Sequence, residues 1–167
     1  MVLKSINRRK LMLGIDIPGF GLIKLNHLVS DFTGTLSVDG KLLLGVKGQL
    51  NKIAKFLKIH ILTADTFGKA RAELKGINCK IHILEGKNHD VQKKKYVEKL
   101  GARNVVAFGN GNNDRKMLKT AKIGISVCLK EGCSTDAIKS SDILVKSTAD
   151  ALDLLLKPKR LKATLRF

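Results

Sequence analysis

The chain has 167 residues, of which 44% are hydrophobic, and its mean hydropathy is −0.01. This length and balance suit one folded domain with a full core and argue against a disordered chain. The 32 basic and 14 acidic residues give a formal net charge of +18, which favours anionic partners such as phosphorylated metabolites, nucleic acid or acidic membranes without selecting one of them.

Near the N-terminus, an apolar run follows a basic patch in the segment NRRKLMLGIDIPGFGLIKL. Asp16, Pro18 and Lys24 interrupt this run and no small-residue cleavage site follows, so the segment fits neither a secretory signal nor a membrane span. The pattern instead predicts a hairpin with strands near residues 12–17 and 21–25, joined by a proline–glycine turn. We therefore expect no membrane partner.

Beyond residue 27, apolar runs alternate with polar segments of helical periodicity. This alternation predicts an α/β fold, a Rossmann-like three-layer sandwich with a mainly parallel central sheet. The expected strands cover residues 27–32, 59–64, 80–84, 104–109, 123–127 and 142–145. The expected helices cover residues 47–57, 91–100, 113–121 and 148–156, the last capped by Thr148 and ended before Pro158.

No linker, repeat or low-complexity stretch divides the chain. We therefore expect one domain over residues 1–167, with residues 1–26 as an N-terminal hairpin extension and residues 157–167 as a basic tail. The tail is expected to be solvated or packed at an interface rather than folded over a site.

Three cysteines, Cys79, Cys128 and Cys133, occur at unrelated spacings. An odd number without a framework pattern favours a reduced, cytoplasmic protein over a disulfide-bonded secreted one. Cys128 and Cys133 are close enough in sequence to contact one metal ion, but a stable site needs two further ligands.

Polar residues follow the predicted strands at their carboxyl ends, where ligands bind in a parallel sheet. SDFTGT places Asp31 at the first strand end, then Gly34, which lets a ligand approach the backbone, and the Thr35 hydroxyl. ILTADT places Thr63 and the amide of Ala64 at the second strand end, where they can hold a phosphoryl oxygen.

Two later segments add charged groups. VQKKKYVEKLG carries Lys93, Lys94 and Lys95 near the start of a predicted helix, and AFGNGNND is a glycine-rich turn that contains Asn110 and ends at Asp114, a suitable place for a hard cation. Alone, each of the four segments is most simply a turn, a helix cap or a solvated basic face. Their order and spacing together favour one shared site.

The four segments, in this order, resemble the four motifs of the haloacid dehalogenase superfamily. DFTGTLS resembles the Asp-Lys-Thr-Gly-Thr-Leu-Thr phosphorylation motif of P-type ATPases, and GNGNNDRKML resembles their Gly-Asp-Gly-x-Asn-Asp hinge motif. LTADTFG and ALDLLLKPKRLKATLR have counterparts in the soluble, capless P-type-ATPase-like hydrolases. The resemblance therefore covers nearly the whole chain.

The resemblance implies an Mg²⁺-dependent phosphohydrolase or phosphotransferase. Asp31 matches the nucleophile, which forms an aspartyl-phosphate, and Asp31, the Thr33 carbonyl and Asp114 match the ligands of Mg²⁺. Asn110 stands where many members have Asp, so it either ligates the ion or lies behind the ligands.

The resemblance also implies a set of residues that bind the phosphoryl group. Thr63 matches the hydroxyl that hydrogen-bonds it, and Lys93 matches the lysine that offsets its charge, with Lys94 and Lys95 as alternative registers. The complete phosphate-binding set would be Gly34, Thr35, Thr63, Ala64 and Lys93.

Thr33 departs from the superfamily pattern, in which most phosphatases have an aspartate that acts as general acid and base. Such catalysis is typically worth about 10²–10⁴-fold in rate, and threonine does not titrate near neutrality. A good leaving group needs little protonation, whereas water that attacks the aspartyl-phosphate needs a base. We therefore expect a slow phosphatase in which the phosphoenzyme accumulates, with phosphomonoesters or acid anhydrides as substrates and weak ATPase activity at most.

The intervals from Asp31 to Thr63 and from Thr63 to Lys93 each hold only about one strand–helix unit, which leaves no room for a cap domain. An open site suits a small or macromolecular phosphorylated substrate, or a second copy of the chain that covers it in a homo-oligomer. Two alternatives stay open. Thr33 and Asn110 also fit a regulatory protein with a vestigial phosphoryl site, and the charge of +18 fits an anion- or nucleic-acid-binding protein, although aromatic residues are only 4% and no binding motif is present.

Overall fold

The computed structural model describes residues 12–167 of the chain. Its main sheet has six strands, all paired in parallel, in the order β10-β9-β8-β3-β6-β7. These strands are β3 (His27–Ser30), β6 (Lys58–Thr63), β7 (Lys80–Ile83), β8 (Val105–Gly109), β9 (Ile123–Val127) and β10 (Ile143–Val145). All six predicted strands are confirmed, each to within two residues at either end.

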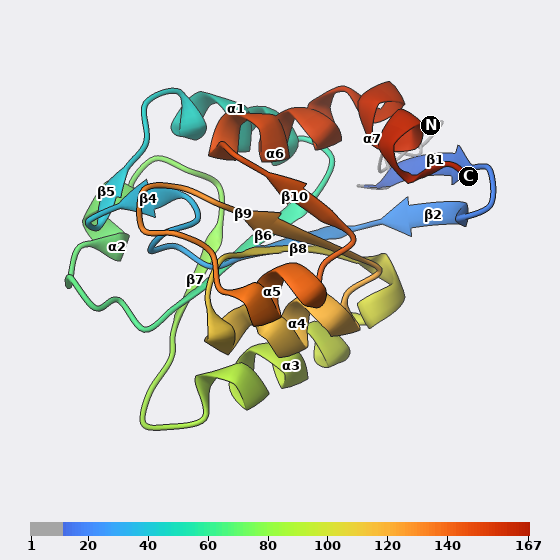
Figure 1. The fold of residues 1–167 in the computed structure, drawn as a ribbon. Coiled ribbons are helices and arrows are strands. Elements are labelled where there is room, and N and C mark those ends of the chain that lie inside the picture. The colour runs from blue at the N-terminus through green and yellow to red at the C-terminus, as the bar shows by residue number, and fades with distance from the viewer. Residues whose placement is uncertain (1–11) are drawn as a thin grey trace, which may run out of the picture.

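Helices cover both faces of this sheet (Figure 1). One face carries α1 (Val46–Ile53), α6 (Thr148–Leu156) and α7 (Pro158–Leu165), and the other carries α3 (His89–Leu100), α4 (Arg115–Thr120) and α5 (Thr135–Lys139). Short helices α2 (Ala70–Glu73), η1 (Ala102–Asn104) and η2 (Asn112–Asp114) complete the set. The predicted three-layer α/β sandwich is confirmed.

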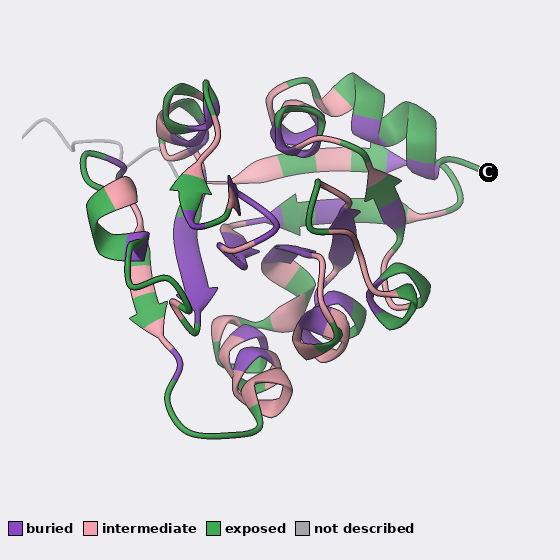
Figure 2. Cartoon of the chain, turned by 60° about the vertical axis from the view of Figure 1, so that its left-hand side comes forward, coloured by how far each residue is buried: buried purple, intermediate pink, exposed green. Residues whose placement is uncertain are grey.

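Burial of the strands follows from this layering (Figure 2). Every residue of β8 and β9 is buried, because both faces of these strands lie under helices. At one edge, β7 alternates exposed and half-buried residues, and its exposed positions are Lys80 and His82. The centre of the sheet is therefore the most deeply buried part of the described chain, and the site described below begins at its central strand, β3.

Two antiparallel hairpins flank the sheet. The predicted N-terminal hairpin is present as β1 (Leu13–Ile17) and β2 (Gly21–Leu25), whereas residues 1–11 of the predicted extension lie outside the described part of the chain. A second hairpin, β4 (Ser37–Val38) and β5 (Lys41–Leu42), follows the end of β3 and was not predicted. Its strands are too short to give an alternating hydrophobic pattern.

The C-terminal residues 157–167, which were predicted as a basic tail, contain helix α7 over Pro158–Leu165. Leu161 and Leu165 of α7 are buried, and the Phe167 amide donates a 3.3 Å hydrogen bond to the Pro18 carbonyl in the β1–β2 turn. The Asn104 side chain, which precedes β8, also bonds the Lys24 carbonyl of β2. Helix α7 and the hairpin thus close the amino end of the sheet, away from the strand ends that carry the motifs. No helix formed by residues 12–167 has the length and hydrophobicity of a membrane span.

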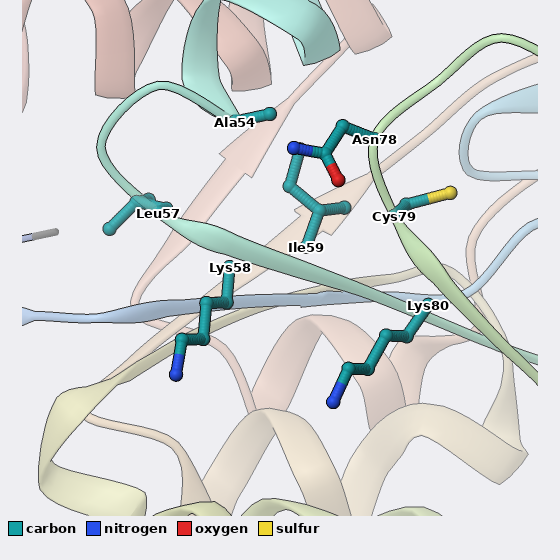
Figure 3. Close-up of a pocket in the computed structure, with 7 residues that line it drawn as sticks. All are labelled: Ala54, Leu57, Lys58, Ile59, Asn78, Cys79 and Lys80. Atoms are coloured by element: carbon teal, nitrogen blue, oxygen red, sulfur yellow. The ribbon is translucent and has the colours of Figure 1, made fainter.

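A cavity of about 140 Å³ also lies at the amino ends of β6 and β7, where the Asn78 side chain is directed toward Ala54 and Leu57 (Figure 3). Figure 3 shows the Lys58 and Lys80 side chains directed to the other side of the strands. This cavity is at the opposite end of the sheet from the predicted site, so it has no part in that site.

A histidine cluster occupies the face of the sheet under α3. The His60 ring is buried, and its two nitrogens lie 3.0 Å from His27 Nδ1 and 2.9 Å from the Tyr96 hydroxyl. Burial, together with His27 and Lys80, lowers the pKa of His60 to about 4. The folded chain therefore holds this ring neutral.

We expect the cluster to make folding sensitive to acid. Because the unfolded ring titrates near 6.5, the stabilising effect of neutral His60 is complete above that pH and is lost as pH falls towards 4, by up to roughly 3 kcal/mol. Urea unfolding at pH 7 and pH 5 should show a smaller pH dependence for His60→Gln than for the natural chain. The exposed His82→Gln is the matched control. Equal dependence in His60→Gln and the natural chain would contradict the assignment.

Candidate phosphoryl site

Asp31 lies directly after β3, the strand between β6 and β8, and its amide donates to the Phe108 carbonyl of β8 at 3.0 Å. Its side chain is largely buried, with 6% of the residue exposed. The turn that follows depends on Gly34, whose φ is +77° and where a Cβ atom would overlap the Asn110 amide group. The glycine in the motif therefore lets two loops meet beside Asp31.

Lys93 enters the site from the second turn of α3. Its Nζ lies 2.7 Å from Asp31 Oδ1 and 2.6 Å from Asp114 Oδ1, and the whole side chain is buried. The neighbouring Lys94 instead pairs at the surface with Glu98, and Lys95 is exposed. Of the three candidate registers, only Lys93 brings its ammonium group to Asp31.

Asp114 lies at the end of η2 and is fully buried. Its Oδ1 accepts from Lys93, and its Oδ2 accepts the backbone N–H groups of Asn110 and Gly111 at 2.9 Å each. Both carboxylate oxygens are therefore engaged, so this residue holds Lys93 and the glycine-rich turn in place.

Thr35 and Asn110 form a second polar layer. The Thr35 hydroxyl lies 3.2 Å from Asn110 Oδ1 and 3.5 Å from Asp31 Oδ2. The side-chain nitrogen of Asn110, Nδ2, donates to the Gly132 carbonyl at 3.1 Å. The backbone carbonyl of Asn110 accepts from the Ser134 amide at 2.7 Å. The Asn110 side-chain oxygen thereby faces the Thr35 hydroxyl, which links it to Asp31 Oδ2.

The charges of the site act in opposite directions on Asp31. Burial and the nearby Asp114 carboxylate raise the pKa of Asp31 to about 7, although Lys93 opposes that shift. Burial by itself would lower the pKa of Lys93, but Asp114 and Asp31 together raise it. Lys93 is therefore a fixed cation, and the charge of Asp31 depends on what binds beside it.

Thr63 is the last residue of β6, the parallel neighbour of β3, and so lies at the same carboxyl end of the sheet as Asp31. Its hydroxyl accepts the Asp65 amide at 2.9 Å, which fixes its rotamer, while the next residue, Ala64, is exposed. Asp65 has φ +51° and its carboxylate accepts the amides of Lys69 and Ala70. This turn begins one residue after the carboxyl end of β6, at the exposed Ala64.

The oxygen atoms around Asp31 suit a divalent cation that keeps part of its water shell. Among residues 12–167, no three His, Cys, Asp or Glu side chains are grouped to hold a metal ion on their own. Mg²⁺, however, usually keeps several waters and takes one or two carboxylates plus substrate phosphate oxygens. Asp31 Oδ2, which lies 3.5 Å from the Thr35 hydroxyl, and Asn110 Oδ1 are oxygens of the right type, so the residues fit this ion.

Thr148 has a structural role different from the one predicted from the sequence. Thr148 was predicted to cap α6, but the cap is Ser147, whose hydroxyl accepts the Asp150 amide at 3.0 Å. The Thr148 hydroxyl instead donates to the Thr35 carbonyl at 2.6 Å and is buried. Adjacent Ser and Thr residues are equivalent as caps in sequence, so only the packing of α6 against the Asp31 turn distinguishes them.

The arrangement is a parallel α/β sheet with a carboxylate at the end of its central strand, paired with a buried lysine. The sequence model of the haloacid dehalogenase-like hydrolases matches residues 47–151, which is more than half of the chain. The chain therefore belongs to this family.

Three comparisons place the chain among known proteins. It is 50% identical over 80 residues to the uncharacterized protein MJ0073 of Methanocaldococcus jannaschii, which covers 46% of this chain and 86% of that protein. It resembles the Moraxella catarrhalis 3-deoxy-D-manno-octulosonate 8-phosphate phosphatase, solved with magnesium, phosphate and KDO, with a TM-score of 0.62 and 22% identity over 85% of this chain and 94% of the other. It also resembles a zinc-transporting PIB-type ATPase in the E2.Pi state, with a TM-score of 0.55 and 25% identity over 74% of this chain and 20% of the other. The two solved structures share the α/β fold of this chain.

Proposed function

We propose that this protein is an Mg²⁺-dependent phosphohydrolase or phosphotransferase that works through an aspartyl-phosphate on Asp31. The observation that carries the proposal is the buried ion-pair chain in which Lys93 lies between Asp31 and Asp114. Lys93 holds Asp31 Oδ1 at 2.7 Å, whereas Oδ2 has only a long 3.5 Å contact with the Thr35 hydroxyl and is the more open oxygen. Family membership and the fold support the same class of reaction.

Each residue has a separate role in the proposed reaction. Asp31 attacks phosphorus with its open oxygen, and the bond from phosphorus to the leaving oxygen breaks. Lys93 offsets the charge of the carboxylate and of the bound phosphate, and it is held in place by Asp114. The Thr63 hydroxyl and the Ala64 amide hold phosphoryl oxygens at the neighbouring strand end.

The proposed metal ligands are Asp31, the Thr33 carbonyl, Asp114 and Asn110. When bound, Mg²⁺ neutralises charge on the phosphoryl oxygens as they pass through the transition state. Asp114 also accepts Lys93 through Oδ1 and the Asn110 and Gly111 amides through Oδ2, and Oδ1 keeps a second lone pair for a cation. The amide at Asn110 contributes no negative charge, so we expect a weaker affinity for Mg²⁺ than a carboxylate there would give.

The second step is the slow one in this proposal. Thr33 offers no titratable group to activate the water that hydrolyses the aspartyl-phosphate. Acyl phosphates, nucleotide polyphosphates and aryl phosphates have leaving groups that need little protonation, so these donors should form the adduct fastest. Weak ATP hydrolysis belongs to this proposal.

The test is to trap the phosphoenzyme. The purified protein is mixed with Mg²⁺ and labelled ATP, acetyl phosphate or an aryl phosphate, and then quenched in acid. We expect an acid-stable, hydroxylamine-labile adduct that is absent in Asp31→Asn and in samples with the metal chelated. Asp39→Asn, which removes a carboxylate from the neighbouring hairpin turn, should form the adduct at the natural rate.

Two results would count against the proposal. An adduct that persists in Asp31→Asn would place the nucleophile elsewhere. No adduct and no phosphate release with any donor would favour the alternative of a regulatory or anion-binding protein with a vestigial site. Circular dichroism of Asp31→Asn establishes that its fold is retained.

A further inference from the structure

Cys128 and Cys133 lie at the two ends of a tight turn that follows β9. Within this turn, Leu129 and Gly132 form an antiparallel bridge, and the Gly132 amide donates to the Leu129 carbonyl at 3.0 Å. Lys130 and Glu131 are the two residues at its tip. The turn is thus a two-residue hairpin with a single bridge, and the two cysteines are the residues that directly flank this bridge.

This register brings the two thiols together. In an antiparallel hairpin, the pair beyond a hydrogen-bonded pair is a non-hydrogen-bonded one, with Cα atoms about 4.5 Å apart and both side chains on the same face. A disulfide requires Cα atoms roughly 4.4–6.8 Å apart. Burial is the main cause that raises the pKa of Cys133, and Cys128 is near enough to contribute to the shift. The position of the turn's bridge and the effect of Cys128 on the pKa of Cys133 both indicate that the two thiols lie side by side.

The pair is also reachable from solvent. Both cysteines are only partly buried, and Cys128 lines a cavity of about 430 Å³ together with Val38 and Leu43. Lys130 and Lys146 line the same cavity. Two ammonium groups beside an accessible thiol suit a reagent that carries carboxylates.

We propose that Cys128 and Cys133 are a redox-active dithiol that closes to a disulfide on reaction with a small anionic disulfide such as oxidised glutathione. The thiolate of Cys128 attacks one sulfur of the oxidant, whose S–S bond breaks and releases one thiol. The thiolate of Cys133 then attacks the Cys128 sulfur and releases the second thiol. Two electrons pass to the oxidant, and the two protons of the cysteines leave on the two released thiols.

The position of the turn gives this reaction a consequence. Gly132 accepts from the Asn110 side chain, Ser134 donates to the Asn110 carbonyl, and Glu131 accepts the Asp39 amide at 2.8 Å. The turn therefore joins the glycine-rich loop beside Asp31 to the β4–β5 hairpin. The oxidation state of the pair acts on the segment that positions Asn110.

The experiment maps the disulfide in the folded full-length chain after equilibration with reduced and oxidised glutathione. Trypsin cuts after Lys122, Lys130 and Lys139, so a closed pair joins peptide 123–130 to peptide 131–139. We expect this linked species in the natural chain and in Cys79→Ser, with no glutathione retained on either cysteine. In the Cys79→Ser background, Cys128→Ser and Cys133→Ser should each instead retain one glutathione.

A quantitative arm compares the folded chain with the chain in concentrated urea. Because the hairpin register holds the thiols together, the equilibrium constant for closure should be at least about tenfold larger in the folded state. Equal or smaller closure in the folded chain would overturn the proposal, as would stable glutathione adducts on Cys128 without closure. These readouts do not involve phosphoryl transfer, so their failure is distinct from failure of the proposed function.

Discussion

Replacing Lys93 with methionine is expected to lower the free energy of unfolding by about 3–5 kcal/mol, because removing one partner of a buried ion pair leaves uncompensated charge. Here the Asp31 and Asp114 carboxylates both lose their cation, and Asp114 is fully buried. Methionine keeps the length and apolar stem of lysine, so the loss reports the charge. Urea unfolding in the presence of a chelator measures it, and phosphoenzyme formation should be lost as well.

The chain supplies a matched control in the adjacent residue. Lys94→Met removes the same charge one position along α3, where the Lys94–Glu98 pair is 3.5 Å long and solvent-exposed, and should change the free energy of unfolding by less than about 1 kcal/mol. Adding Asp31→Asn to Lys93→Met should recover part of the lost stability, since one fewer carboxylate is left unpaired. Equal losses for the two single lysine variants would show that the buried pair does not stabilise the fold.

Changing Thr33 to aspartate is expected to speed hydrolysis of the aspartyl-phosphate by about 10²–10⁴-fold, the usual effect of a positioned general base. Thr33 lies two residues after Asp31 and is only partly buried, so the larger charged side chain has access to solvent. The measurement is the decay of trapped, labelled phosphoenzyme after excess unlabelled donor is added.

Thr33→Asn is the control for shape, since its side chain nearly matches aspartate and does not titrate. Its phosphoenzyme should decay at the natural rate, and the acceleration in Thr33→Asp should disappear below the pKa of the new carboxyl group. The same decay rate in both variants would mean that the slow step is limited by something other than the missing base. An Asp31→Asn chain provides the blank for the label.

The parallel sheet was predictable because its central strands are buried on both faces. Such strands are continuous apolar runs, as in β8 and β9, and their ends are marked by polar motifs. Asp31, Lys93 and Asp114 meet because ligand-binding residues of a parallel sheet collect at the carboxyl ends of its strands. The roles assigned to these residues in catalysis stay predictions.

Features that depend on packing between distant segments were not predictable in this way. The β4–β5 hairpin has only two residues per strand, and α7 combines basic residues with two buried leucines, a pattern that reads equally well as a solvated tail. The sequence also could not predict that both Asp114 oxygens accept hydrogen bonds, because the donors to Oδ2 are backbone amides. Every residue other than proline has a backbone N–H group, so the residue types do not show which of these groups will donate to a side chain.

The two edges of the sheet differ in how they discourage strand addition. An exposed edge strand offers unpaired backbone groups to other chains, and short length or charged side chains reduce that tendency. Strand β10 has only three residues, and β7 exposes Lys80 and His82. In a chain of charge +18, a second copy that approached β7 would bring like charges together. The protein should therefore resist fibril-like growth through its sheet edges even at high concentration.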